Sequence, residues 1–326
     1  MKKQLLIAAV AATMGTAAMA DVSITGDAKF EYFNTETSTV STNKTNTEVN
    51  LGIKGKNGDT TVVANLEFNT HDAASNTVSA MDIEDLYMTT KIGDVTVKGG
   101  NYATGTSAIL GEIDNGGRAN DKVTISGSNG GVSWYAGNSG TSGGSTQIDG
   151  NMFVGASMDV AGWKVQAKHN SATVDSFGIS GEVSGVGIRL EQKNDTATNG
   201  DTTFGNVTYS TNGIDLAYAW LDSDKANQID EDDSAIFAVE NGIVTATTDT
   251  GNAQITAKTS VAGNTVTVKS GSVENGIATG TDLDYTQIAV SRPLASGATF
   301  AATYTDKDDS PTTDTQILEL DLSVKF

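Results

Sequence analysis

Alternation of apolar and polar residues constrains this chain more than any other feature. It is clearest in the last segment, 318–326, where every second residue is apolar and the residues between are polar. The same period of two recurs in fifteen further segments between residues 22 and 305. No part of the chain beyond residue 20 shows a comparable helical stripe. Side chains alternate across a β-strand, so the pattern predicts strands with one apolar and one polar face, and an all-β fold.

The connections between these segments alternate between short and long. Short ones such as Asn57-Gly58-Asp59 and Asn129-Gly130 supply the positive φ angles that tight hairpins need. Tight turns on one rim and longer polar loops on the other are typical of a transmembrane antiparallel β-barrel, with the short turns in the periplasm and the long loops outside the cell. We predict 16 strands, an even number. A β-solenoid would instead show one repeat length, and sandwich modules give no reason for the alternation.

The N-terminus has the pattern of a secretory signal. Lys2 and Lys3 precede a short apolar run, and Ala18-Met19-Ala20 follows it as a small-x-small cleavage site. We therefore expect residues 1–20 to be a signal peptide and residues 21–326 to form the barrel. A buried N-terminal helix is the alternative. Export as a barrel predicts a location in the outer membrane of a Gram-negative bacterium.

The charge of the chain narrows the classes of partner. A net charge of −20 repels nucleic acid, so we expect no nucleic-acid partner. The chain has no Cys and only two His, His71 and His169. Each His falls in or beside an expected loop, where a solvated residue is more common than a catalytic base. We expect no enzymatic activity.

Three segments resemble a known family. They are Thr90 to Gly100, Gln287 to Leu294 followed by Ala298 to Tyr304, and the C-terminal strand. Together they resemble the Gram-negative general diffusion porins, a family of trimeric sixteen-stranded barrels. The resemblance implies a homotrimer with a water-filled channel for passive diffusion of small hydrophilic solutes and ions. It also implies contact with outer-membrane lipids and with the barrel assembly machinery, which would read Leu322, Val324 and Phe326 as a C-terminal signal.

The resemblance also implies a site. The loop after the fifth strand of that family narrows the channel, and the matching segment here is 102–120, which contains Glu112, Asp114 and Arg118. A mobile external loop is the alternative. Basic residues that would face this loop from the strands are Lys29, Lys54, Lys91 and Lys98. Because the acid excess lies mainly in the loops, we expect a weak preference for cations.

One connection, 223–282, is far longer than the others. We expect a long extracellular loop insertion. Two additional strands, giving eighteen, are the alternative and would favour a substrate-specific channel; a surface adhesin that uses this loop is a further one. Acidic residues gather at its start, and four of them offer the oxygen ligands that Ca²⁺ prefers: Asp222, Asp224, Asp230 and Asp232. A solvated acidic run is the alternative, and no other cofactor is expected.

Overall fold

The computed structural model describes ten parts of the chain: residues 21–69, 81–103, 118–138, 152–171, 174–195, 200–224, 237, 249–275, 282–309 and 313–326. The expected signal peptide, residues 1–20, lies outside them. Eighteen strands occupy these parts. In chain order they are β1 (Asp21–Thr37), β2 (Ser41–Asn57), β3 (Thr60–Asn69), β4 (Asp82–Ile92), β5 (Val95–Ala103), β6 (Arg118–Asn129), β7 (Val132–Asn138), β8 (Met152–Val160), β9 (Trp163–Asn170), β10 (Val174–Val183), β11 (Val186–Asp195), β12 (Gly200–Thr211), β13 (Ile214–Ser223), β14 (Asp249–Val261), β15 (Asn264–Asn275), β16 (Leu283–Pro293), β17 (Ala298–Asp309) and β18 (Thr313–Lys325).

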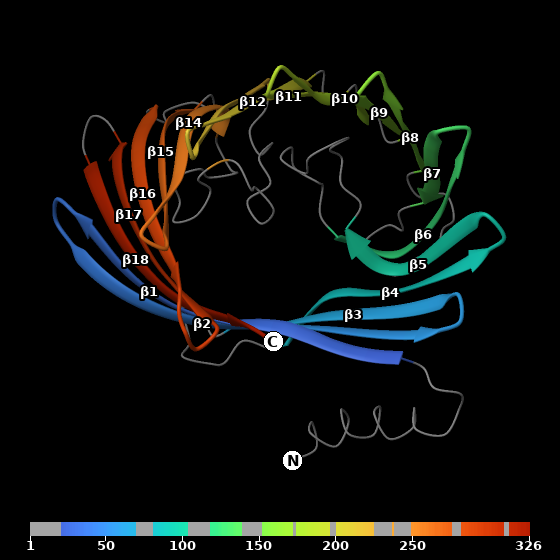
Figure 1. Ribbon diagram of the computed structural model, residues 1–326, viewed down its shortest axis with the longest axis horizontal. Helices are drawn as coiled ribbons and strands as arrows, with labels where there is room; N and C mark the ends of the chain where they lie inside the picture. The colour runs from blue at the N-terminus through green and yellow to red at the C-terminus, as the bar shows by residue number, and fades with distance from the viewer. Residues whose placement is uncertain are drawn as a thin grey trace, which may run out of the picture.

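The strands form one closed antiparallel barrel. Each strand pairs with its neighbours in sequence, and β1 also pairs with β18, with Asp27 opposite Lys325. Figure 1 shows β1 lying between β2 and β18. Two backbone hydrogen bonds of 2.9 Å between Gly26 and Phe326 complete the seam at the chain end. Closure leaves no strand edge unpaired, which a barrel in a lipid bilayer requires.

The strand count corrects the expectation of sixteen. The two additional strands, β14 and β15, both lie within 223–282, the segment expected to be a loop. They are joined by Ala262 and Gly263, whose φ angles of 52° and 78° make a tight hairpin turn. The apolar alternation fades on β15 because Ser270 and Ser272 follow Val268 on the same face, so the pattern that identified the other strands was too weak here.

The outer face of the barrel is apolar. Phe30, Ile255 and Phe326 are 47%, 60% and 59% exposed, and many other large apolar residues are exposed in the same way. An outward band of this kind is the surface that contacts lipid. The residues that the structure describes include no helix long and apolar enough to cross a membrane.

Aromatic rings lie over glycines on both faces of the wall. On the outer face, a Cβ at Gly205 would come within 2.0 Å of the ring of Trp220. On the inner face, a Cβ at Gly155 would come within 2.1 Å of the ring of Tyr135. Glycine is required at these positions because the ring occupies the space of its missing side chain.

Candidate functional site: the channel lumen

Polar and charged side chains point inward from the barrel wall. An eighteen-stranded barrel of this type encloses an aqueous channel rather than a packed core, so these inward side chains form the candidate site. The charges are not mixed evenly round the lumen. Carboxylates predominate on β18 and β1 to β3, whereas lysines predominate on β5, β6, β9 and β11, where the buried Glu191 lies two residues from Lys193 on the same face of β11.

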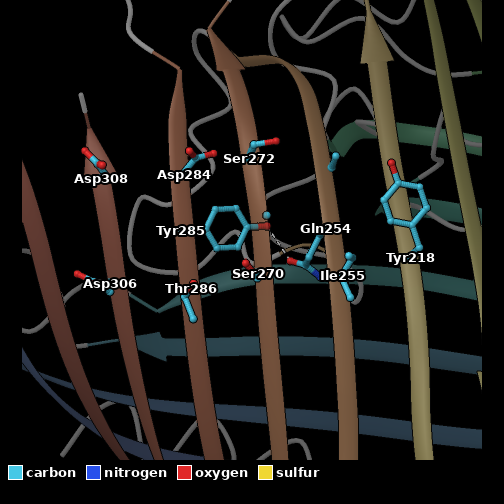
Figure 2. Close-up of a pocket in the computed structure, with 12 residues that line it drawn as sticks. Tyr218, Gln254, Ile255, Ser270, Ser272, Asp284, Tyr285, Thr286, Asp306 and Asp308 are labelled. Carbon is cyan, nitrogen blue, oxygen red and sulfur yellow. Dashed lines mark hydrogen bonds between the residues drawn. The ribbon is translucent and has the colours of Figure 1, made fainter. Parts of the chain in front are cut away.

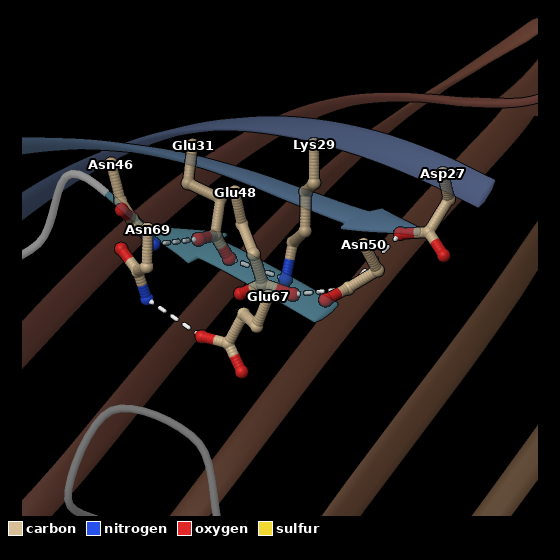
Figure 3. Close-up of polar contacts among 8 residues, drawn as sticks. All are labelled: Asp27, Lys29, Glu31, Asn46, Glu48, Asn50, Glu67 and Asn69. Carbon is tan, nitrogen blue, oxygen red and sulfur yellow. Dashed lines mark hydrogen bonds and ion pairs between the residues drawn. The ribbon is translucent and has the colours of Figure 1, made fainter. Parts of the chain in front are cut away.

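The carboxylates form an acidic wall, defined by Asp27, Glu31, Glu48, Glu67, Glu319 and Asp321. Strand pairing places Glu31 beside Asp321 and Asn50 beside Glu67. Asparagines separate the carboxylates: Asn46 donates to Glu31 at 2.8 Å, and Asn50 donates to Glu48 at 2.6 Å (Figure 3). These amide donors stabilise the charged form of a carboxylate without neutralising it.

Within this wall, Glu31, Glu319 and Asp321 form a tight group, in which one carboxylate oxygen from each residue lies within 4.8 Å of the other two. Glu31 and Glu319 are buried. Lys29 forms an ion pair with Glu31 (Figure 3). The ammonium group of Lys29 therefore offsets part of the repulsion between the three carboxylates.

The lysines form a basic wall, defined by Lys98, Lys122, Lys168 and Lys193. Ser176 on β10 pairs with both Lys168 and Lys193, which places these two lysines in one register row. Lys98 and Lys122 lie on the neighbouring strands β5 and β6. By strand order β9 and β11, with Lys168 and Lys193, lie on the side of the ring opposite β1, whereas β5 and β6, with Lys98 and Lys122, lie between them and the acidic wall.

Aromatic rings accompany these lysines. The Nζ atom of Lys98 lies 3.7 Å from the ring centre of Tyr87 and 3.8 Å from that of Tyr102. Lys122 donates to the backbone carbonyl of Tyr102 at 2.6 Å. Tyr102 in turn hydrogen-bonds through its hydroxyl to Thr124 at 2.6 Å. Contact with the faces of two rings stabilises the Lys98 ammonium group and fixes its place in the lumen.

The side chains on this side of the lumen differ in how far they are exposed to the channel. Lys122, Lys168 and Lys193 are at most 7% exposed, so they act on a solute mainly through their electric field. Lys98 and the tyrosines Tyr87 and Tyr135 are only half-buried. A passing solute can therefore touch Lys98 and these tyrosines directly.

A third stretch of the inner wall, on β14 to β17, presents mainly amides and hydroxyls. Tyr285 donates to Gln254 at 2.8 Å (Figure 2), and Gln287 donates to Thr305 at 3.2 Å. A pocket of about 500 Å³ lies mainly on the outer side of the same strands, where outward residues such as Ile255, Ser272 and Asp284 line it (Figure 2). The stretch can exchange hydrogen bonds with solutes of either charge.

The four lysines that were expected to face the constriction loop all lie on the inward face of their strands, but they do not form one group. Lys98 belongs to the basic wall, whereas Lys29 pairs with Glu31 in the acidic wall. Lys54 and Lys91 are exposed near the short-turn rim. The sequence gives no sign that Lys122, Lys168 and Lys193 belong to one wall, because only the pairing of strands brings them together.

The expected constriction loop is described only at its ends. Tyr102 and Ala103 belong to β5, and Arg118 begins β6, where its backbone pairs with Ala103. Arg118 is thus a strand residue rather than a loop residue. Glu112 and Asp114 lie outside the described residues, so the narrowing of the channel by this loop stays a prediction.

The acidic residues proposed for Ca²⁺ are only partly described. Asp222 is exposed near the end of β13. The carboxylate of Asp224 accepts a hydrogen bond from the backbone N–H of Asp201 at 3.1 Å. Asp230 and Asp232 lie outside the described residues. Calcium binding there stays a prediction.

Of the two histidines, His71 lies outside the described residues. His169 contacts Asp175 at 2.6 Å, and both side chains are exposed. His169 neighbours the inward Lys168 in sequence, so it points to the opposite face of the strand, away from the lumen. The structure thus gives His169 no position from which to act on a solute in the channel.

A closed antiparallel barrel with an apolar outer face and a charged lumen defines an outer-membrane β-barrel protein. Solved structures with this fold include several from Pseudomonas aeruginosa. OccK11 (OpdR) is 13% identical, with a TM-score of 0.66 over 94% of this chain and 96% of that one. The outer membrane protein OpdK is 11% identical, with a TM-score of 0.67 over 94% and 98% of the two chains. A structure of OpdK with vanillate is 11% identical, with a TM-score of 0.64 over 93% and 98%.

At such identities the likeness shows the fold alone. Comparisons of the sequence with family models and with curated proteins gave no match. The outer-membrane barrel and its location in the bacterial outer membrane are confirmed. The count of sixteen strands is wrong, and these findings give no support to a trimeric general diffusion porin.

Proposed function

We propose that this protein is an outer-membrane channel that selects small organic anions, in particular those with an aromatic ring, during passive diffusion. The observation that carries the proposal is the half-buried ammonium group of Lys98, which lies 3.7 Å from the ring centre of the half-buried Tyr87. A carboxylate would contact the ammonium group of Lys98, and a planar ring would pack against the neighbouring Tyr87. General diffusion, the function first expected, would need no such group.

The two walls act together on such a solute. The buried lysines Lys122 and Lys168 attract the negative end, and the acidic wall repels it from the other side. Charges in a poorly solvated wall act over a longer range than charges in water. A solute with one charged end is therefore oriented as it passes, with its carboxylate toward β5 to β9.

The OpdK structure with vanillate supports the plausibility of this solute class. Vanillate is an aromatic carboxylate, and OpdK shares the barrel fold of this chain. The 11% identity does not carry vanillate over to this protein. The chemistry of the basic wall is the independent argument.

Uptake into proteoliposomes tests the proposal. We expect arabinose to enter slowly and in proportion to its concentration, because the channel is water-filled. We expect labelled 4-hydroxybenzoate to enter faster, to saturate, and to be competed by its unlabelled form but not by arabinose. Linear, uncompeted uptake of 4-hydroxybenzoate would support general diffusion instead. Uptake no faster than into protein-free liposomes would exclude a channel altogether.

A further inference from the structure

A second pocket, of about 570 Å³, lies close to the short-turn rim and is lined mainly by inward side chains of β4 to β8. Ser126 lies four residues after the buried Lys122 on β6, so both side chains point to the inner face. Strand pairing places Ser126 beside Thr96 on one side and Tyr135 on the other. The lining does not include Lys98, so this pocket is separate from the group that holds the carboxylate. We call it the rim pocket.

Hydroxyl groups dominate the inner lining of the rim pocket. Ser128 and Ser133 face each other across the β6–β7 pair and share a hydrogen bond of 2.9 Å. A hydroxyl group both donates and accepts, so this lining can bind a hydroxyl group of a solute in either sense. The residues that supply hydroxyl groups are Thr96, Ser126, Ser128, Ser133, Tyr135 and Ser157.

Tyr135 also gives the rim pocket a flat apolar surface. Its ring lies over Gly155, where an added Cβ would come within 2.1 Å of it. One face of the ring therefore rests on the wall, and the half-buried side chain presents the other face to the channel. The planar ring of a solute can pack on that face.

The charges of the rim pocket do not favour an anion. Lys91 and Asp94 contribute one charge of each sign to the lining, and both residues are exposed. Exposed charges interact weakly with a solute, because water and salt screen them. The rim pocket is therefore suited to recognise a solute by its hydroxyl groups and its ring rather than by its carboxylate.

We propose that the rim pocket is a second solute site, which binds the ring hydroxyl of an aromatic anion and makes the channel prefer hydroxybenzoates to benzoate. This inference rests on the proposed function, because it takes the solute to be an aromatic anion. Lys98 pairs with Thr124, and Thr96 pairs with Ser126 two residues closer to the short turns, about 7 Å along the strands. A solute that leaves Lys98 toward this rim thus passes the rim pocket.

Block of single-channel current in planar bilayers tests the preference. 4-Hydroxybenzoate and benzoate share the carboxylate and the ring, and they differ only in the hydroxyl group. We expect the half-blocking concentration of 4-hydroxybenzoate to be about fivefold lower in the wild type, as one net hydrogen bond would give. In Ser126→Ala/Ser157→Ala the two concentrations should become nearly equal.

The control keeps the number of hydroxyl groups removed from the lumen the same. Ser180 and Ser291 are inward and half-buried, as Ser126 and Ser157 are, but they lie outside the rim pocket. Ser180→Ala/Ser291→Ala should therefore keep the fivefold difference. Tyr135→Leu removes the flat surface, so it should weaken the block by both compounds and leave their ratio unchanged.

Thiol labelling locates the bound solute without relying on current. The chain has no Cys, so an introduced thiol is the only one. Ser133→Cys places it in the rim pocket, and Ser291→Cys places it elsewhere on the inner wall. A saturating concentration of 4-hydroxybenzoate should slow the reaction of a small neutral maleimide severalfold at position 133 and not at position 291. Benzoate should slow the reaction at position 133 less.

The outcomes distinguish this inference from the proposed function. A preference for 4-hydroxybenzoate that is lost in Ser126→Ala/Ser157→Ala and kept in the control, with protection at position 133, supports the rim pocket. Equal block by the two compounds in the wild type overturns it, as does a preference that survives in Ser126→Ala/Ser157→Ala. In those cases a block that still depends on Lys98 leaves the proposed function standing. No block by either compound would contradict the proposed function as well.

Discussion

At the scale of single residues, the inner wall depends on glycines that make room for rings. Tyr135 lies over Gly155, and the ring of Phe153 lies close to Gly137, where an added Cβ would come within 2.5 Å of it. Tyr135 and Phe153 also contact each other, with ring centres 6.1 Å apart. This packing holds the aromatic part of the lumen flat against the strands. Gly155 is therefore a residue whose replacement should change the channel without touching a charge.

We predict that Gly155→Ala displaces the ring of Tyr135. The added methyl group would overlap the ring, so the ring must leave the wall and enter the lumen, at a cost of about 1–3 kcal/mol in stability. Single-channel conductance should fall, and the unfolding temperature should decrease. Gly55→Ala is the matched control, since a Cβ at Gly55 meets nothing within 4 Å. Equal behaviour of the two variants would show that the ring contact is unimportant.

At the scale of elements, β18 completes the barrel and carries the expected assembly signal. Phe326 keeps two backbone hydrogen bonds to Gly26, while its side chain is 59% exposed on the outer face. The ring thus contributes little burial to the folded barrel. Its position fits a residue that is read during assembly rather than one that stabilises the product.

We predict that Phe326→Ser lowers the amount of folded protein in the outer membrane severalfold, because the assembly machinery would no longer recognise the C-terminal aromatic. Refolding of the purified variant into detergent should be nearly normal. The measurement is the folded, heat-modifiable band on gels of outer-membrane fractions and of refolded protein. Val160→Ser, at another exposed apolar position near a strand end, is the control. An equal loss in membranes and in detergent would mean that Phe326 acts on stability instead.

Much of the element structure could be predicted from the sequence, and the exceptions have physical reasons. Alternation and turn chemistry identified sixteen of the strands and the short-turn rim, because a two-faced strand in lipid must alternate. The β14–β15 hairpin was placed in a loop because serines interrupt its outer face. The alternation ends near residue 33 and predicts a loop over 34–45, but β1 extends to Thr37 and β2 begins at Ser41. Where a strand extends beyond the lipid, both of its faces are polar. The sequence therefore shows no alternation of apolar and polar residues there.

The candidate site was less predictable than the strands. The alternation of side chains predicted that Lys29 and Lys98 face the lumen. It could not predict that Lys29 lies beside Glu31 or that Lys98 lies between two tyrosines. Those contacts depend on register and on rotamers, which a period of two does not encode. Phe237 is buried, with its ring centre 5.9 Å from that of the inward Phe204, but nothing in the sequence indicated this contact, since a single aromatic residue in a polar segment does not reveal which surface it will meet.

At the scale of the whole molecule, the two charged walls bear on ion selectivity. Acidic residues number 40 against 20 basic ones, yet the lumen sets lysines against carboxylates. We predict that small inorganic cations are only weakly preferred, because both signs of ion find a favourable wall. Reversal potentials in a KCl gradient measure this preference. A strong preference for either ion, or any clear preference for chloride, would contradict it.

Assembly is a second property at this scale. A homotrimer is implied by the family resemblance and stays a proposal. Native mass spectrometry of the detergent-purified protein would give the number of subunits directly. Three subunits would support the proposal, and a monomer would contradict it.

The most direct test of the account asks whether the basic wall recognises the solute. The measurement is the block of single-channel current by 4-hydroxybenzoate in the wild type, in Lys98→Gln and in Lys122→Gln/Lys168→Gln. Lys258→Gln, which removes the same charge at an exposed position on β14, is the control. We predict that Lys98→Gln raises the half-blocking concentration about tenfold, as expected when a half-buried ionic contact is lost. The double variant should also raise it, while the control should not. Half-blocking concentrations that are the same in all four proteins would contradict the account.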